Sequence, residues 1–142
     1  MSGALAYPVQ LHQRPGGFLV TFPDLEDART SGPDERHALA EAVDCLRAAL
    51  AARMLHGEEI PSPSEPSADA RLVRVPAEVA AKLIVYVAFL RSGLTKSQLA
   101  VRLDVDESEV RRILDPRHRT KLGRLEQAAD ALGTGLYVGR LN

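Results

Sequence analysis

The stretch Leu94-Thr-Lys-Ser-Gln-Leu-Ala-Val-Arg-Leu-Asp-Val-Asp-Glu-Ser-Glu-Val-Arg-Arg-Ile-Leu114 decides how the second half of this chain folds. Its apolar residues recur at helical spacing in two groups, first Leu99, Ala100 and Leu103, then Val110, Ile113 and Leu114. Between the groups, Asp104-Val105-Asp106 has the form of a tight turn with one apolar residue. The pattern predicts two short helices joined by this turn, which is typical of a helix-turn-helix whose second helix enters the DNA major groove.

The residues of the turn support this prediction. Asp106 can cap the second helix by accepting a backbone N–H, and the small Ala100 lets the two helices cross closely. Asp104 stands where many such motifs have glycine, and Asp tolerates the left-handed conformation better than most residues. A purely structural helical hairpin has the same apolar spacing, so the DNA-binding interpretation depends on the turn, the cap and Arg111-Arg112 together.

The composition is that of a globular chain in a reducing compartment. Its 142 residues are 45% hydrophobic but only 4% aromatic, so the core must be built from Leu, Val, Ile and Ala. The single cysteine excludes an internal disulfide. We find no signal peptide, and the apolar run Leu83–Leu90 is too short to cross a membrane. We therefore expect a cytoplasmic protein without a membrane partner.

Charge is divided unevenly along the chain. Residues 1–60 contain five basic and nine acidic side chains, whereas residues 71–142 contain thirteen basic and eight acidic ones. An acidic first half and a basic second half indicate two modules with different partners. The plainer alternative, that charge keeps both halves soluble, does not require this division.

The first part of the chain has the pattern of a β-hairpin followed by a helix. Alternation predicts strands at Tyr7–Leu11 and Phe18–Phe22, and a short third strand is expected at Ala28–Ser31. A helix capped by Asp34 should then run to about His56. Its expected apolar stripe, which would cover the sheet, is formed by Leu39, Val43, Leu46, Leu50 and Met54.

A proline-rich segment, residues 61–70, is expected to be a linker between one domain at residues 1–60 and another at residues 71–142. The predicted fold class is α+β. An antiparallel sheet with one helix is followed by a mainly helical domain with short flanking strands.

The second domain is expected to begin with a short strand at Leu72–Val75. Pro76 should open a buried helix whose repeating apolar positions are Val79, Leu83, Tyr86/Val87 and Leu90. After the helix-turn-helix we expect a last helix at Leu122–Leu132, closed by Gly133. A terminal strand is expected at Leu136–Leu141, and it could pair with the strand at Leu72–Val75, within the chain or across a dimer.

DNA contact is expected at the start of each motif helix and in the basic segment after the motif. Arg112 could form a bidentate contact with guanine, and Glu107 could accept from cytosine or serve the helix dipole. The cluster Arg117–Lys121 is the densest basic one in the chain and should meet phosphate. The predicted DNA-binding residues are Lys96, Ser97, Gln98, Asp106, Glu107, Ser108, Arg111, Arg112, Arg117, His118, Arg119 and Lys121. A homodimer or higher homo-oligomer that reads two half-sites of double-stranded operator DNA is expected.

Catalysis finds little support in the sequence. The four histidines are scattered without metal-ligand spacing, and a glycine-rich phosphate loop is missing. Asp24, Glu26 and Asp27 could hold a divalent ion, but surface turns are often acidic. Cys45 is interpreted as a small core residue. We predict no catalytic residue, no metal and no cofactor.

Several segments resemble, in their order along the chain, the HicB family of antitoxins. In the first half they are Tyr7-Pro-Val, Gly17-Phe-Leu-Val-Thr-Phe-Pro-Asp-Leu25, the helix start at Gly32 and Asp34 with Ala38-Leu39, and Gly57-Glu-Glu-Ile-Pro-Ser-Pro-Ser64. The segment Arg111–His118, with Leu122 and Leu125, is similar to the helix-turn-helix tail of that family. Two positions depart from the pattern, because Glu26-Asp27 replaces a usual Pro-Gly turn and His37 stands where Glu is common.

The resemblance implies an antitoxin of a two-component toxin–antitoxin system. Its first module, similar to a partial RNase H-like fold without the catalytic acids, would bind and mask a small HicA-type RNA-cleaving toxin. Its second domain would bind the operator of its own operon and repress transcription. The resemblance implies no enzymatic activity for this chain.

Two alternatives come from other classes of protein. A free-standing helix-turn-helix repressor would use the first module to sense a small ligand. A nuclease relative that kept its activity would need carboxylates on neighbouring strands, and Tyr7–Phe22 contains none.

Overall fold

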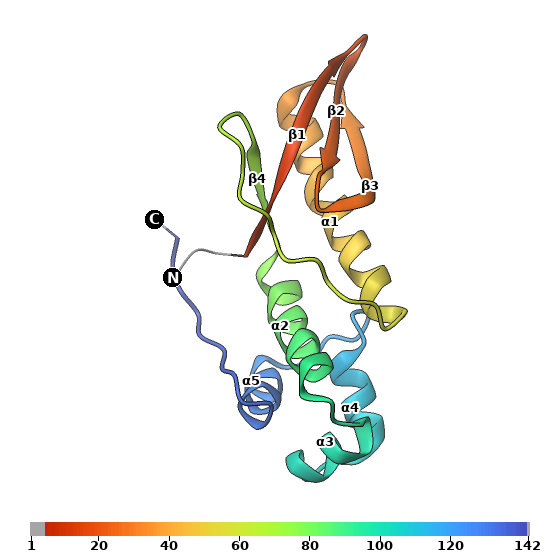
Figure 1. Cartoon of the computed structure of the whole chain (residues 1–142), viewed down its shortest axis with the longest axis vertical. Helices are drawn as coiled ribbons and strands as arrows, with labels where there is room; N and C mark the ends of the chain where they lie inside the picture. The colour runs from red at the N-terminus through yellow and green to blue at the C-terminus, as the bar shows by residue number, and fades with distance from the viewer. Residues whose placement is uncertain (1–4, 142) are drawn as a thin grey trace. The chain divides into compact units, whose positions relative to one another are not determined.

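A computed structural model describes residues 5–141 of the chain. The chain forms two compact units. The first unit comprises the residues up to Arg53 together with Ile60–Ala77. The second comprises Met54–Glu59 together with the residues from Glu78 onward. Strands occur in the first unit and short helices dominate the second, so the predicted α+β class is confirmed (Figure 1).

The first unit contains an antiparallel sheet of four strands in the order β3-β2-β1-β4. The expected hairpin is confirmed as β1 (Ala6–Arg14) and β2 (Gly17–Phe22), with Leu11 opposite Val20. The expected third strand is confirmed and is longer than predicted, because β3 spans Leu25–Gly32. Alternation turns one side of each strand inward, and the buried residues include Tyr7, Val9, Val20, Phe22 and Leu25.

Helix α1 (Glu35–Leu55) lies along one face of this sheet (Figure 1). Its start is the predicted one, because Asp34 Oδ1 accepts a hydrogen bond from the backbone N–H of His37 at 2.8 Å. The predicted apolar stripe was partly wrong. The completely buried row is Ala38, Ala42, Leu46 and Leu50, whereas Leu39 and Val43 are only partly buried. Alanine allows a close approach of helix and sheet, which a count of large apolar residues overlooks.

Two glycines lie where the start of α1 meets the hairpin. A Cβ added to Gly17 would stand 2.1 Å from the carbonyl oxygen of Gly32, and one added to Gly32 would stand 2.5 Å from the backbone nitrogen of Ala38. Both obstructing groups are backbone atoms and cannot turn aside. We infer that the hairpin and the start of α1 depend on glycine at these two positions.

Gly17→Ala is therefore expected to lower the free energy of unfolding by about 2 kcal/mol. Gly123→Ala is the matched control, because Gly123 lies in a helix and an added Cβ has open space around it. Gly123→Ala should raise the free energy of unfolding by about 0.5–1 kcal/mol, because alanine gives the unfolded chain less backbone entropy than glycine. Urea unfolding followed by circular dichroism measures both changes. An unchanged midpoint for Gly17→Ala would contradict the packing described above.

Strand β4 (Arg71–Arg74) is the expected short strand, but its partner differs from the predicted one. It pairs with β1 at the sheet edge, with Tyr7 opposite Val73, and so lies in the first unit. The sequence alone predicts this strand in the second domain, with residues 136–141 as its partner. Pairing across more than sixty residues of chain has no local signal in sequence, which is why the expectation failed.

The proline-rich segment before β4 is attached to the first unit. The Tyr7 hydroxyl donates to the carbonyl oxygen of Pro61 at 2.6 Å, and burial raises the pKa of this phenol to about 12. The carboxylate of Asp24 accepts hydrogen bonds from both the backbone N–H and the hydroxyl of Ser64, at 2.9 and 3.1 Å. The segment therefore follows the surface of the first unit, whereas a free spacer would lack such contacts.

The second unit contains α2 (Ala77–Ser92), α3 (Lys96–Leu103), α4 (Glu107–Leu114) and α5 (Leu122–Ala131), so the expected helices are confirmed. Its core consists of Val85, Leu99, Ala100, Val110, Ile113, Leu114, Leu125, Ala128 and Ala129. Helix α2 meets this core through Val85, with Ala81 and Phe89 packed beside it. The predicted face of α2 was wrong at Leu90, which is 38% exposed. A helix that is apolar on most sides leaves its core face undecided.

The end of the chain departs from the prediction. Residues 136–141 form no strand in the described structure, and Tyr137 and Val138 are exposed. The prediction of short strands flanking the second domain is therefore wrong, because β4 belongs to the first unit and residues 136–141 form no strand. None of the helices in residues 5–141 has the length and apolar character that crossing a bilayer requires.

Candidate nucleic-acid interface

The turn between α3 and α4 has the predicted left-handed residue. Asp104 adopts φ 54° and ψ 48°. The N–H of Val105 donates to the carbonyl of Ala100 at 3.0 Å, and that of Asp104 donates to the carbonyl of Val101 at 3.2 Å. These bonds close α3 as a Schellman motif, and Val105 packs half-buried against the core. The predicted tight turn with one apolar residue is confirmed.

Asp104→Gly is expected to raise the free energy of unfolding by about 0.5–1 kcal/mol, because glycine adopts this backbone conformation without the steric cost of a Cβ. Asp106→Ala, two residues away, is the matched control. It should lower the free energy of unfolding by about 1 kcal/mol, because it removes a helix cap. Thermal unfolding of the two variants measures the contrast. A destabilised Asp104→Gly variant would mean that the Asp104 side chain has a structural role beyond its backbone angles.

The first turn of α4 is held by Asp106. Its Oδ1 accepts the backbone N–H of Glu109 at 2.9 Å and the hydroxyl of Ser108 at 2.6 Å. The Ser108 hydroxyl, followed by the backbone N–H of Glu109, lowers the pKa of Asp106 below its usual range. The predicted cap is confirmed. Asp106 and Ser108 bind each other here, so a base contact by either would require that hydrogen bond to be exchanged.

The exposed side of α4 carries the predicted arginines. Val110, Ile113 and Leu114 are buried, and the opposite side of a helix with 3.6 residues per turn presents Ser108, Arg111 and Arg112. Because α4 is only eight residues long, this side contains nearly all of its potential contacts with a partner.

Glu107 joins the two helices of the motif. Its carboxylate accepts the hydroxyl of Ser97, at the start of α3, and pairs with Arg111 one turn later, both at 2.5 Å. The Ser97 hydroxyl is the main cause that lowers the pKa of Glu107. Sequence reasoning offered a base contact or a dipole role for Glu107, and the structure adds that it orients Arg111.

A second ion-pair cluster holds Arg112. Its Nη2 lies 2.8 Å from Oε1 of Glu109, whose other oxygen lies 3.5 Å from Nε of Arg124 on α5. Arg124 was absent from the predicted contact set, although it stands close to the basic segment in sequence. Pairs whose arginine is solvated contribute about 0–1 kcal/mol each, so Arg112 can leave Glu109 for a DNA base at little cost.

The start of α3 is capped by its own residues. The Thr95 hydroxyl accepts the backbone N–H of Gln98 at 3.1 Å, and the Gln98 side chain accepts that of Thr95 at 2.9 Å. This capping box occupies the carbonyl end of Gln98, one of the predicted contact residues. Lys96, between the two, is exposed and has no ion pair within residues 5–141.

The basic segment after α4 is partly ordered by Asp115. Its carboxylate accepts the backbone N–H of Arg117 at 2.9 Å and pairs with the Arg117 guanidinium, which chiefly lowers the pKa of Asp115. His118 Nδ1 lies 3.1 Å from the Thr120 hydroxyl. Arg119 and Lys121 are exposed and form no ion pair with the described part of the chain. With Lys96, they are the cations of the predicted contact set that have no ion pair among the described residues.

One functional candidate was missed. Lys82 on α2 is 6% exposed, and its Nζ donates to the carbonyl of Arg112 at 2.8 Å and to that of Asp115 at 2.6 Å. The available signal was a lone lysine inside the apolar run of α2, which ordinarily indicates a side chain extending to solvent.

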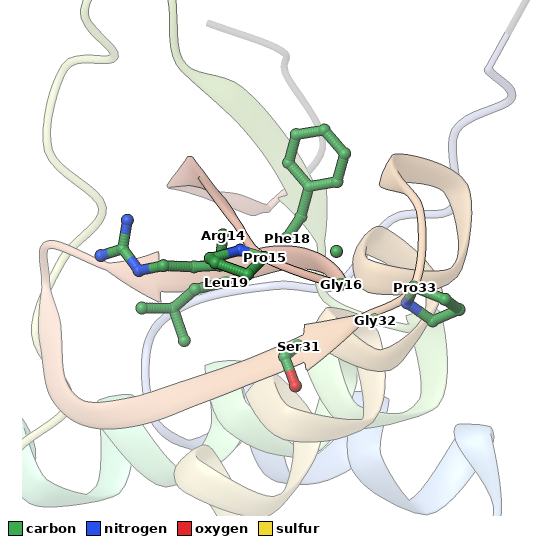
Figure 2. Close-up of a pocket in the computed structure, with 9 residues that line it drawn as sticks. Arg14, Pro15, Gly16, Phe18, Leu19, Ser31, Gly32 and Pro33 are labelled. Atoms are coloured by element: carbon green, nitrogen blue, oxygen red, sulfur yellow. The ribbon is translucent and has the colours of Figure 1, made fainter.

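The alternative sites of the first unit have protein partners or an open shape. Asp24 binds Ser64 and Asp27 pairs with Arg53 at 2.9 Å, so two of the three acidic turn residues are engaged. Within the described residues, no group of three potential metal ligands occurs. Figure 2 shows an open hollow at the hairpin end, where Phe18 and Leu19 point to opposite sides and Arg14 is the charged residue.

Comparison with known proteins agrees with the two-part organisation. Residues 6–84 match the family described as the HicB-like antitoxin of bacterial toxin-antitoxin systems, and residues 90–136 match a helix-turn-helix domain family. The chain is 40% identical over 135 residues to antitoxin HicB 1 of Photorhabdus laumondii, covering 94% of this chain and 86% of the relative. It is 35% identical to antitoxin HicB of Escherichia coli, covering 94% and 98% of the two chains.

A further relative, antitoxin HicB of Pseudomonas fluorescens, is 31% identical over 134 residues, covering 93% of this chain and 91% of the relative. These relatives are named as antitoxins rather than as enzymes, in agreement with the expected lack of catalytic activity.

Proposed function

Because this chain belongs to the HicB-like family of antitoxins, we propose that it neutralises a small HicA-type RNA-cleaving toxin and represses its own operon. The first unit binds the toxin, and α3 and α4 bind operator DNA. The observation that carries the proposal is the presence, in one chain, of a HicB-like sheet and a helix-turn-helix with arginines on its exposed side.

The exposed side of α4 supports major-groove recognition. Arg112 has the donors for a bidentate contact with guanine O6 and N7, and Arg111 beside it is oriented by Glu107. Lys96, Arg119 and Lys121 supply charge for the phosphates on either side. A homodimer places two copies of α4 about 34 Å apart, one turn of B-DNA, or a multiple of this spacing.

The charge of the first unit supports a basic partner. The first unit, residues 1–53 and 60–77, contains seven basic and nine acidic side chains, and the second unit contains eleven basic and ten acidic ones. An RNA-cleaving protein must itself be attractive to a polyanion, so an acidic surface would steer it into the complex. The particular toxin-contacting residues are not assigned.

A growth and reporter experiment tests both halves of the proposal. The short gene beside that of this chain is induced in cells with and without the full-length chain, and a reporter follows the operon promoter. We expect growth arrest by the neighbour alone, rescue by this chain, and lower reporter output when the chain is present. Rescue without any effect on the reporter would remove the autorepression half, and repression without rescue would remove the antitoxin half.

A ligand-sensing repressor is the other candidate considered from the sequence. It requires a concave apolar pocket with converging polar groups in the first unit. The hollow of Figure 2 is open and glycine-rich, with Arg14 as its one charged side chain, so it gives that alternative no specific support.

A further inference from the structure

Lys82 is the charged residue that the described structure buries. It is 6% exposed on α2, where its neighbours Leu83 and Val85 are buried as well. Burial of an ammonium group is unfavourable unless polar groups surround it, and replacement of such a group by an apolar one is often neutral or stabilising. Stability alone therefore does not account for a lysine at this position.

The partners of Lys82 are two carbonyl groups at the end of α4. One belongs to Arg112, the predicted base reader, and the other to Asp115, where the basic segment begins. Both carbonyls also have a backbone donor, since Asp115 N–H binds Arg112 and His118 N–H binds Asp115, at 3.2 and 3.1 Å. Lys82 therefore adds a further hydrogen bond to each of two carbonyl groups that already accept one from a backbone N–H, and so bridges them.

The bridge has a geometric consequence. Helix α4 has only two turns, and Pro116 follows its C-cap, so few intrahelical bonds determine where its last turn lies. A positive charge at the C-terminal carbonyls complements the helix dipole and fixes this end against α2. The same ammonium fixes the start of the segment that carries Arg117, Arg119 and Lys121.

We propose that Lys82 is a positioning residue for operator recognition, which holds the end of α4 and the start of the basic segment in one arrangement so that Arg112 and the phosphate-binding cations dock together. The inference rests on the proposed DNA-binding function. Lys82 itself is buried and does not contact DNA.

The charge state of Lys82 gives a signature for this role. Burial, opposed by the nearby carboxylates of Asp115 and Glu109, lowers its pKa from 10.5 to about 8. Since the folded pKa lies below the unfolded one, the unfolded chain binds more protons between these values, and the Lys82 contribution to stability rises with pH. Operator recognition should instead fall as pH rises through about 8, because the neutral amine binds the two carbonyls more weakly.

The experiment compares the full-length protein with Lys82→Met, and with Arg91→Met as a control that removes an exposed charge from the same helix. Two duplexes serve as probes, one from the promoter directly upstream of this chain's gene and one with the same bases scrambled. We expect Lys82→Met to lose about tenfold in promoter affinity but less than about twofold on scrambled DNA. Its unfolding temperature should not fall, and Arg91→Met should bind both duplexes like the parent.

A pH series on the parent protein gives a second readout that does not depend on a variant. The preference for promoter over scrambled DNA should decrease through about pH 8, and it should be independent of pH in Lys82→Met. Equal losses on both duplexes, or a parent preference that stays flat through this range, would overturn the positioning role. A parent protein that does not distinguish the two duplexes at any pH would overturn the proposed function, and the inference with it.

Discussion

Arg112→Ala is expected to abolish most of the discrimination between operator and random DNA, with a loss of roughly 10- to 100-fold in operator affinity. The reason is geometric, since Arg112 lies on the exposed side of α4 and must release the half-buried Glu109 to reach a base. Because the Arg112 side chain of this ion pair is largely solvated, stability should change by less than about 1 kcal/mol. Gel shifts on both DNAs, at two salt concentrations, measure the effect.

Arg119→Ala is the matched comparison for Arg112→Ala. Arg119 is exposed in the basic segment and should contact phosphate, so its removal should weaken binding to all sequences and reduce the salt slope by about one ion. The pair of variants separates base reading from backbone contact. If Arg112→Ala lost affinity equally on operator and random DNA, the base-reading role of Arg112 would be rejected.

Residues 1–77 are expected to rescue cells from the toxin, whereas residues 1–60 should fail or rescue poorly. The shorter fragment lacks β4, which pairs with β1, and the segment that Tyr7 and Asp24 hold in place. Removal of β4 and this segment exposes one edge of β1 and uncovers Tyr7, so the sheet should be less stable and prone to aggregation. Growth after toxin induction measures rescue, and circular dichroism of each purified fragment shows whether it is folded.

The control for this prediction is Arg74→Ala in residues 1–77, which alters an exposed side chain of β4 but keeps the backbone pairing. It should rescue as well as the parent fragment. Equal rescue by residues 1–60 and 1–77, at equal protein levels, would mean that β4 is dispensable for toxin binding. Residues 71–142, the second domain predicted from the sequence, are expected to bind operator DNA through α3 and α4.

The helix-turn-helix could be predicted in detail because its determinants are local. Val110, Ile113 and Leu114 share a face within one short helix, and Asp104 and Asp106 act within a few residues of their own positions. The same holds for the β1–β2 hairpin. Short-range patterns of this kind are visible in a single sequence.

The failure at β4 comes from long-range pairing. The partner of β4 is β1, far away in the chain, and nothing within Arg71–Arg74 indicates that choice. Helix α2 is apolar on most of its surface, so its periodicity could not tell Ala81, Val85 and Phe89 from the other rows. The bridge from Lys82 to α4 was hidden for the same reason.

The members of the candidate DNA-binding site stay a prediction, whereas the structure shows how their side chains are held. The sequence places Arg111 and Arg112 on the second helix of the motif, but it could not reveal that Glu107 and Glu109 hold them. It follows that the acidic residues of α4 orient the arginines before DNA arrives. The base contacts of Asp106, Glu107 and Ser108 remain predictions.

Purification of the tagged chain from its native operon tests the central claim most directly, because the partner and the DNA activity are measured on one sample. We predict that a small basic protein encoded beside this chain co-purifies with it, and that the eluted material shifts the operon promoter but not a scrambled duplex. If this chain eluted alone from cells that express the neighbouring gene, and shifted both duplexes equally, the account of a self-regulating antitoxin would be contradicted.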